Sequence, residues 1–201
     1  MKTPPTNKNT QLRVLLLDET FDRAVLLKHA LHEAGCWIAA HVASSEDLLG
    51  LVNELKPDAV ILDIASPGQT LFAHLCEINR TEPCPIVMFT QDGGSATMRE
   101  AMRAGVSAYV VDGLSSERLR FIMDVAMVRF KELQYMRNSL EKAEGQLAAR
   151  KEIERAKGIL MRQRGVTEEE AYQSLRKLAM DKGVKLADVA RQVISVAGLL
   201  A

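Results

Sequence analysis

The amino-acid sequence predicts an α/β protein: a five-stranded, doubly wound parallel sheet, then a long helix with coiled-coil character, then a small three-helix all-α module. Two observations carry this prediction. Five short apolar runs alternate with segments of helical periodicity up to Val111, which is typical of a parallel sheet covered by helices on both faces. Residues 115–164 then contain no proline and only two glycines, and helix-forming side chains dominate them.

The predicted strands are the apolar runs, and turn-forming residues separate them from the predicted helices. The strands cover residues 13–17, 37–42, 59–62, 85–89 and 108–111. The helices between them are predicted to end at Gly35, Leu55, Arg80 and Gly105, and Ser115 opens the long helix. We therefore expect a disordered tail over 1–10, a sheet domain over 11–128, a coiled-coil linker over 129–149 and the all-α module over 150–201.

Polar side chains stand where three of the predicted strands end. Asp18 and Glu19 follow the first strand, Asp63 follows the third and Thr90 follows the fourth. In a doubly wound sheet, ligands bind beyond the carboxyl ends of the strands. Three carboxylates gathered there would repel one another unless they held a cation, and oxygen ligands suit Mg²⁺. Asp63 could then attack a phosphoryl group to give an acyl phosphate, with Thr90 bonded to the phosphoryl oxygens.

Four segments in this region resemble the receiver domain of bacterial response regulators. They are VLLLDET (14–20), VILDIASPG (60–68), VMFT (87–90) and GVSAYVV (105–111). The resemblance implies that Asp18, Glu19 and Asp63 bind the metal and that Asp63 is the phospho-acceptor. It also implies that Thr90 is the switch hydroxyl and Tyr109 the aromatic residue that reports the switch.

The sequence departs from the receiver pattern after the fifth strand. Receivers usually have Lys-Pro there, whereas this chain has Asp112-Gly113. A carboxylate in place of the cation would lie near a phosphoryl dianion, and like charges at a few ångströms repel each other. Two interpretations stay open: a receiver fold that has kept its shape as a scaffold for partners, or one that still accepts a phosphoryl group.

Charge and composition limit the class of protein. Residues 1–130 carry 12 basic and 16 acidic residues, and residues 131–201 carry 14 and 10. This asymmetry suggests an anionic partner for the second half, and an ordinary solvated surface is the alternative. No apolar run reaches the roughly 18 residues of a membrane span. Cys36, Cys76 and Cys84 match no metal-binding spacing. We expect a cytoplasmic protein with three buried, reduced thiols.

The middle of the long helix carries a heptad pattern. Apolar residues recur with a/d spacing at Leu133, Met136, Leu140, Ala143 and Leu147, with charged residues between them, as in a coiled coil. We expect a dimer contact here through Leu133, Met136, Leu140 and Leu147. The alternative is a solvated helical linker.

The last predicted module has three helices and a basic surface. Thr167 and Glu170 form a capping-box pattern at the start of its second helix, which is expected to bury Ala171, Leu175, Leu178 and Ala179. Arginines and lysines cluster on the first helix and recur on the second, which is a modest footprint of nucleic-acid binding; a solvated basic face is the alternative. Recognition of duplex DNA is disfavoured, because the second helix begins with three glutamates, which phosphates would repel.

Residues 153–180 resemble the ANTAR module, an RNA-binding antiterminator domain. The matching positions are Ala156-Lys157, Leu160-Met161, Gly165, Glu170-Ala171, Leu175, Ala179-Met180 and Leu186. The order of receiver, coiled coil and ANTAR module, with the Asp112 variant, resembles regulators of nitrate and nitrite assimilation.

The ANTAR resemblance implies a non-enzymatic function: a dimer binds paired hairpins in a nascent leader RNA and prevents a terminator from forming. It also implies a nitrate- or nitrite-binding sensor protein of the NasS type as a partner. The residues expected to contact RNA are Lys157, from the family pattern, and Arg162, Arg164, Arg176 and Lys177, from charge and position. Met161, Ala179 and Met180 are expected in the core. Two alternatives are a DNA-binding response regulator and a scaffold that binds only protein.

Overall fold

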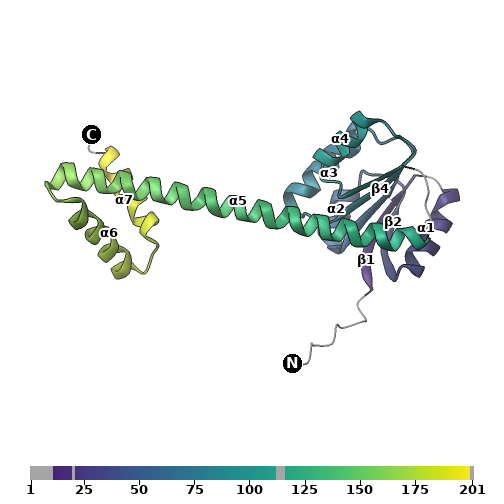
Figure 1. Ribbon diagram of the computed structural model, residues 1–201, viewed down its shortest axis with the longest axis horizontal. Helices are drawn as coiled ribbons and strands as arrows, with labels where there is room; N and C mark the ends of the chain where they lie inside the picture. Colours follow the sequence, from purple (N-terminus) through teal and green to yellow (C-terminus); the bar gives the residue numbers. More distant parts are fainter. Residues whose placement is uncertain (1–10, 20, 112–115, 200–201) are drawn as a thin grey trace, which may run out of the picture. The chain divides into compact units, whose positions relative to one another are not determined.

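The computed structural model describes residues 11–19, 21–111 and 116–199 (Figure 1). The chain divides into two compact units, residues 1–133 and residues 134–201. The predicted tail over 1–10 lies outside the described residues, as do Asp112, Gly113 and Ser115.

The N-terminal unit is a five-stranded parallel sheet with helices on both faces, as predicted. Its elements are β1 (Leu12–Asp18), α1 (Phe21–Glu33), β2 (Cys36–Val42), α2 (Leu48–Leu55), β3 (Ala59–Asp63), α3 (Gln69–Thr81), β4 (Ile86–Thr90), α4 (Ser95–Arg103), β5 (Ala108–Val111) and the start of α5 (Ser116–Arg164). The strand order is β2-β1-β3-β4-β5, and all four pairings are parallel. This is the doubly wound order in which the chain reverses direction across the sheet beside β1.

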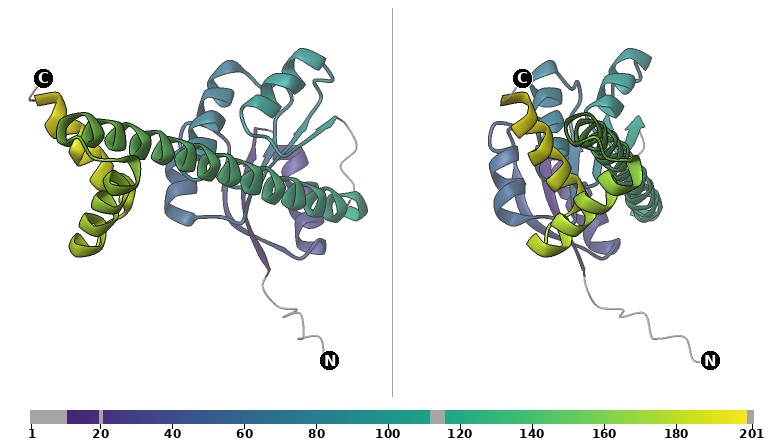
Figure 2. Two further views of the ribbon diagram at one scale, coloured as in Figure 1. Left: turned by 60° about the vertical axis from the view of Figure 1, so that its left-hand side comes forward. Right: turned by 90° about the vertical axis from the view of Figure 1, so that its left-hand side faces the viewer.

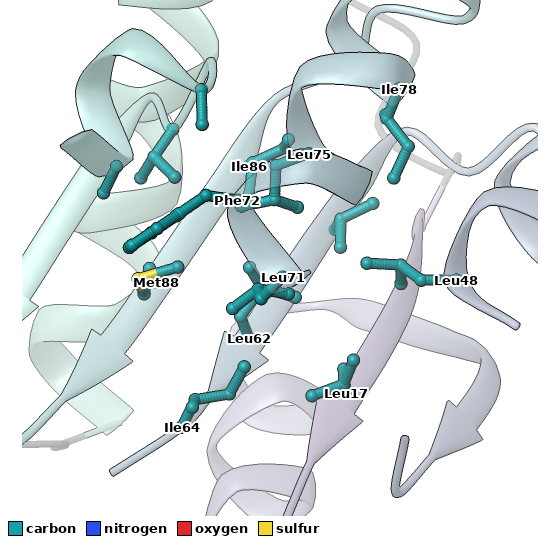
Figure 3. Close-up of a cluster of buried hydrophobic side chains, with 14 of the residues drawn as sticks. Leu17, Leu48, Leu62, Ile64, Leu71, Phe72, Leu75, Ile78, Ile86 and Met88 are labelled. Carbon is teal, nitrogen blue, oxygen red and sulfur yellow. The ribbon is translucent and has the colours of Figure 1, made fainter. Parts of the chain in front are cut away.

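Two apolar clusters cover the two faces of the sheet because successive strand residues point to opposite sides. Leu62 of β3 packs under α2, α3 and α4, whereas Ile61 packs under α1 and α5. Figure 3 shows part of the first cluster, in which Leu71, Phe72 and Leu75 of α3 lie over the sheet. The apolar runs of the sequence are therefore buried on both sides, which is why they do not alternate with polar residues.

Helix α5 has a different environment in each unit. In the N-terminal unit, Leu119, Met123 and Ala126 are buried against the sheet at the helical spacing that the sequence predicts. In the stretch of α5 before its core residues of the C-terminal unit, the predicted heptad residues Leu133 and Leu140 are 51% and 60% exposed. Met136 and Leu147 are exposed as well.

The C-terminal unit comprises the second part of α5, α6 (Glu168–Lys182) and α7 (Leu186–Leu199). Figure 2 shows α6 and α7 against the end of α5. Their core consists largely of small side chains: Ala156, Leu160, Ala171, Leu175, Ala179, Val189 and Ala190. Gly165 and Gly183 have φ of 65° and 63° and end the first two helices, because glycine adopts this left-handed conformation without steric cost.

Three apolar residues of this unit lie elsewhere than predicted. Met180 is 71% exposed, Leu178 is 38% exposed and Met161 is 37% exposed. The buried stripe of α6 runs through Ala171, Leu175 and Ala179, spaced four residues apart. Leu178 and Met180 each sit one residue, or about 100° of helical rotation, away from Ala179. The prediction of Ala179 as a core residue is confirmed, and that of Met161, Leu178 and Met180 is wrong.

The three cysteines differ in burial. Cys36 and Cys84 are buried as predicted, but Cys76 is exposed on α3. Burial raises the pKa of the Cys84 thiol to about 12, so that this thiol stays protonated and inert. Within the described residues, no helix has the length and apolar character needed to cross a membrane.

Candidate functional site: an acidic sheet edge and a basic helical unit

Asp18 and Asp63 form the centre of the acidic edge. They end neighbouring strands and are register partners across β1 and β3. Both are 3% exposed, and the backbone N–H of Glu19 donates to the carbonyl of Asp63 at 3.4 Å. The strand order places this pair where the sheet reverses direction, the position at which doubly wound sheets bind ligands.

The predicted third carboxylate does not join this pair. Glu19 follows the end of β1 and its side chain is exposed. No group of three or more His, Cys, Asp or Glu side chains in the described ranges is arranged to hold a metal ion. Two buried carboxylates are ligands of the kind that Mg²⁺ prefers, so the donor chemistry fits the ion, but the three-carboxylate set expected from the sequence is not assembled.

Thr90 and Tyr109 connect the acidic edge to β5 through backbone contacts. The buried Thr90 Oγ1 donates to the carbonyl of Ala65 at 3.0 Å and accepts from the N–H of Asp92 at 3.1 Å. The Tyr109 hydroxyl donates to the carbonyl of Asp92 at 2.7 Å. Thr90 is therefore hydrogen-bonded to the loop that follows Asp63, and Tyr109 is hydrogen-bonded to the loop that follows Thr90.

The electrostatics around Tyr109 preserve this connection. Burial raises the pKa of the Tyr109 hydroxyl, and the charge of Asp92 raises it further, so the hydroxyl remains a donor at neutral pH. Hydrogen bonds from the Thr97 side chain and the Gly94 N–H lower the pKa of Asp92. Asp112, the residue at which the sequence departs from the receiver pattern, lies outside the described residues.

His41 on β2 also lies near the acidic edge, a position that was not predicted from the sequence. Burial and the charge of Lys28 lower the pKa of His41, while the charge of Asp18 opposes them. The imidazole is therefore neutral at pH 7 and adds no positive charge beside Asp18. Only the register of β2 against β1 brings it there.

Lys157 has a role that the sequence did not predict. Its side chain is 9% exposed, and its Nζ lies 2.8 Å from Glu154 Oε1 and 2.7 Å from Glu168 Oε1. These two carboxylates raise the pKa of Lys157, chiefly through their hydrogen bonds. Its ammonium joins α5 to the first turn of α6, so the charge expected on the RNA-facing surface is used inside the protein.

The other four predicted cations have the expected exposure. Arg162, Arg164, Arg176 and Lys177 are all exposed. Within the described part of the chain, none of their side chains takes part in a salt bridge. These four charges are available to an anionic ligand.

The strand order, the buried carboxylate pair and the Thr90–Tyr109 connection together define a receiver-type signalling domain. The response regulator receiver domain model matches residues 14–124, more than half of the chain, and the ANTAR domain model matches residues 141–194. The chain therefore belongs to the response regulator family and carries an ANTAR domain behind its receiver, as the sequence predicted.

The chain is also similar to two curated proteins and to a solved structure. The chain is 28% identical over 200 residues to the transcriptional regulatory protein PdtaR of Mycobacterium tuberculosis, covering 98% of each chain. A nitrate regulatory protein of Klebsiella oxytoca is 43% identical over 68 residues, which cover 34% of this chain and 17% of that protein. The receiver domain of a modulated diguanylate cyclase from Desulfovibrio desulfuricans superposes with a TM-score of 0.54 at 19% identity, over 61% of this chain and 98% of that one. This last likeness concerns the fold alone.

Proposed function

We propose that the protein is a transcription antiterminator whose C-terminal ANTAR domain binds paired hairpins in a nascent leader RNA. The match of the ANTAR model to residues 141–194 carries this proposal. The exposed cations Arg162, Arg164, Arg176 and Lys177 supply positive charge for RNA phosphates. Tyr172 is the only aromatic residue of the module, so recognition depends on phosphate and loop contacts more than on base stacking.

The active form in this proposal is a homodimer. One module holds one hairpin, so a pair of hairpins requires two copies. The apolar heptad residues of α5, Leu133, Met136, Leu140 and Leu147, are all more than half exposed in the single chain. A second α5 would cover them in a parallel coiled coil, which fixes the two modules at one spacing.

Control by a partner protein completes the proposal. A nitrate- or nitrite-binding sensor protein sequesters the regulator when its ligand is absent, and the regulated genes serve nitrate and nitrite assimilation. The 68-residue likeness to a nitrate regulatory protein supports this assignment. Phosphorylation of Asp63 is the second possible input, which Asp112 would disfavour by placing a further carboxylate near the phosphoryl group.

A binding experiment tests the proposal. The full chain is incubated with a pool of RNAs that contain two adjacent stem-loops with randomised loops, and separately with duplex DNA of the same length. We expect retention and enrichment of RNA, with log K falling as log salt rises. Preferential retention of duplex DNA would indicate a DNA-binding regulator, and retention of neither would indicate a protein-binding scaffold.

The same assay separates the two modes of control. If acetyl phosphate with Mg²⁺ raises the RNA affinity of the wild type but not that of Asp63→Asn, phosphorylation is the switch. Equal affinities with and without acetyl phosphate are the expected result, because sequestration by a partner does not need the acyl phosphate.

A further inference from the structure

Lys151, Arg155, Gly158 and Arg162 lie on one face of α5. Their spacing of four, three and four residues stacks them along about three turns of the helix. The face is opposite to the core stripe of Ile153, Ala156 and Leu160, which packs against α6 and α7. We call these four residues the α5 basic stripe. Lys151 and Arg155 belong to the basic cluster seen in the sequence, but only Arg162 was expected to contact RNA.

The positive charge of the α5 basic stripe is uncompensated within its own unit. The segment 150–164 contains two acidic residues, Glu152 and Glu154. Glu152 pairs with Arg191 of α7 at 3.4 Å, and Glu154 pairs with the buried Lys157 at 2.8 Å. Lys151, Arg155 and Arg162 are exposed and have no salt bridge to any other described residue. Because Glu154 pairs with Lys157 and Glu152 pairs with Arg191, neither carboxylate forms a salt bridge with the stripe, which keeps its positive charge.

Gly158 stands in the middle of this stripe without an internal reason for being glycine. It lies inside α5, where glycine is less favourable than alanine by up to a factor of about five in the helical equilibrium. A Cβ added there would meet no atom within 4 Å, so no packing in the folded chain excludes a side chain. Glycine in such a position is explained when a ligand or another backbone must approach the helix closely.

We infer that the α5 basic stripe is the phosphate-backbone contact of the RNA site, with Gly158 as the point of closest approach. Here Lys151, Arg155 and Arg162 bind phosphates on either side of the strand that crosses Gly158. A second copy of α5 is the other candidate for a close approach at a helical glycine. The charges disfavour it, because a symmetric contact on this face would bring three cations of each chain against three of the other.

This inference rests on the proposed RNA function and names its contact surface. It also replaces Lys157 as the central cation of that surface. Lys157 becomes a positioning residue: by pairing with Glu154 it removes a negative charge from the edge of the stripe, and by pairing with Glu168 it fixes α6 behind the stripe.

The test compares two glycines of the same helix. Gly145 is also inside α5, and a Cβ there would also meet nothing within 4 Å, but it lies outside the stripe and at an outward heptad position. Gly158→Ala and Gly145→Ala should both raise the melting temperature of the unit slightly, since alanine favours the helix. With the RNA enriched from the two-hairpin pool, Gly158→Ala should weaken binding on the order of tenfold, because the added methyl group would hold the strand away from the cations beside it and weaken their charge-assisted contacts. Gly145→Ala should bind as the wild type does.

Charge variants complete the test. Arg155→Gln and Arg162→Gln should each lower the slope of log K against log salt by about one, whereas Lys142→Gln, on α5 outside the stripe, should not. A Gly158→Ala protein that binds RNA like the wild type would overturn the inference while leaving the antiterminator proposal intact. Altered sedimentation of Gly158→Ala without RNA would overturn it in favour of a helix–helix contact. A wild type that retains no RNA would overturn both.

Discussion

The N-terminal unit, or receiver, and the C-terminal unit, here called the ANTAR unit, bury charge in opposite ways. The receiver places two carboxylates, Asp18 and Asp63, side by side at the edge of its sheet, where they repel each other when both are ionised. The ANTAR unit buries one ammonium, that of Lys157, between two carboxylates that lie largely at the surface. The first arrangement favours an incoming cation, whereas in the second the charge of the ammonium is already balanced within the fold.

The two units also differ in how they are held together. In the described part of the chain, the receiver has two apolar clusters built from large side chains such as Leu62, Ile61 and Phe89. The ANTAR unit has one cluster, and four of its seven buried residues are alanines. Small units with small cores depend more on caps, ion pairs and partner chains. A core substitution that unfolds the ANTAR unit should therefore leave the receiver folded when the equivalent change is made there.

The largest expected effect comes from core truncation in each unit. Leu62 is 0% exposed and Leu175 is 1% exposed, and Leu→Ala at such sites costs about 2–5 kcal/mol. Leu62→Ala should lower the stability of the receiver but leave it folded, whereas Leu175→Ala should unfold the ANTAR unit. Hydrogen exchange read separately for residues 14–124 and 141–194 measures both effects. Equal loss of protection in the two units by both variants would contradict the comparison.

The next effect concerns the exposed heptad residues of α5, from Leu133 to Leu147. Leu133→Asp with Leu140→Asp places two charges in the proposed seam, and we expect the dimer to dissociate in sedimentation experiments, because buried unpaired carboxylates are costly. Asn138→Asp with Gly145→Asp adds the same charge at outward heptad positions and serves as the control. A wild type that sediments as a monomer both free and bound to RNA would show that the seam is only a linker.

A smaller effect is expected from Lys157→Met, which keeps the apolar stem and removes the ammonium. Glu154 and Glu168 then lose their shared partner, so the start of α6 should exchange amide hydrogens faster and the ANTAR unit should melt at a lower temperature. Lys177→Met, at an exposed position on α6, is the matched control. If both variants melt alike, the paired ammonium does not position α6.

The sequence predicted the sheet well because burial on both faces leaves a plain signal. Runs such as Ala59–Leu62 are apolar throughout, and the residue after each run falls at the same edge of the sheet, so Asp18, Asp63 and Thr90 could be placed together. Met180 was wrongly placed in the core because the buried stripe of α6 is narrow. A shift of one residue along the helix, about 100° of rotation, moves a side chain from the core to the surface. The ion pairs of Lys157 could not be predicted, because an amphipathic cation in a basic segment gives no sign of whether two carboxylates will enclose it. Gly158 is one of only two glycines in residues 115–164, but the sequence alone assigned it no role. Gly145 has equally open surroundings, so only the position of Gly158 among the cations, on the face of α5 opposite to the core, distinguishes it.

The smallest expected effect is the response of the ANTAR unit to acid, which the capping box and the Lys157 pair should govern. The bond from the Thr167 N–H, followed by that from its hydroxyl, lowers the pKa of Glu170, and the bond from Lys157 lowers the pKa of Glu168. A carboxylate with a lowered folded-state pKa binds its proton more readily in the unfolded chain. Its contribution to the free energy of unfolding is therefore complete above the ordinary glutamate pKa of 4.5. That contribution is lost as the pH falls through the lowered pKa.

The ANTAR unit should accordingly lose melting temperature progressively below pH 4.5. Glu170→Gln retains an oxygen that can accept the Thr167 N–H but does not titrate, so its melting temperature should depend less steeply on pH in that range. Glu169→Gln removes a neighbouring carboxylate that accepts from Gln173 instead of the cap, and its pH profile should stay close to that of the wild type. Parallel profiles for Glu170→Gln and the wild type would mean that the cap does not contribute to the acid response, and that the unit loses stability in acid for another reason.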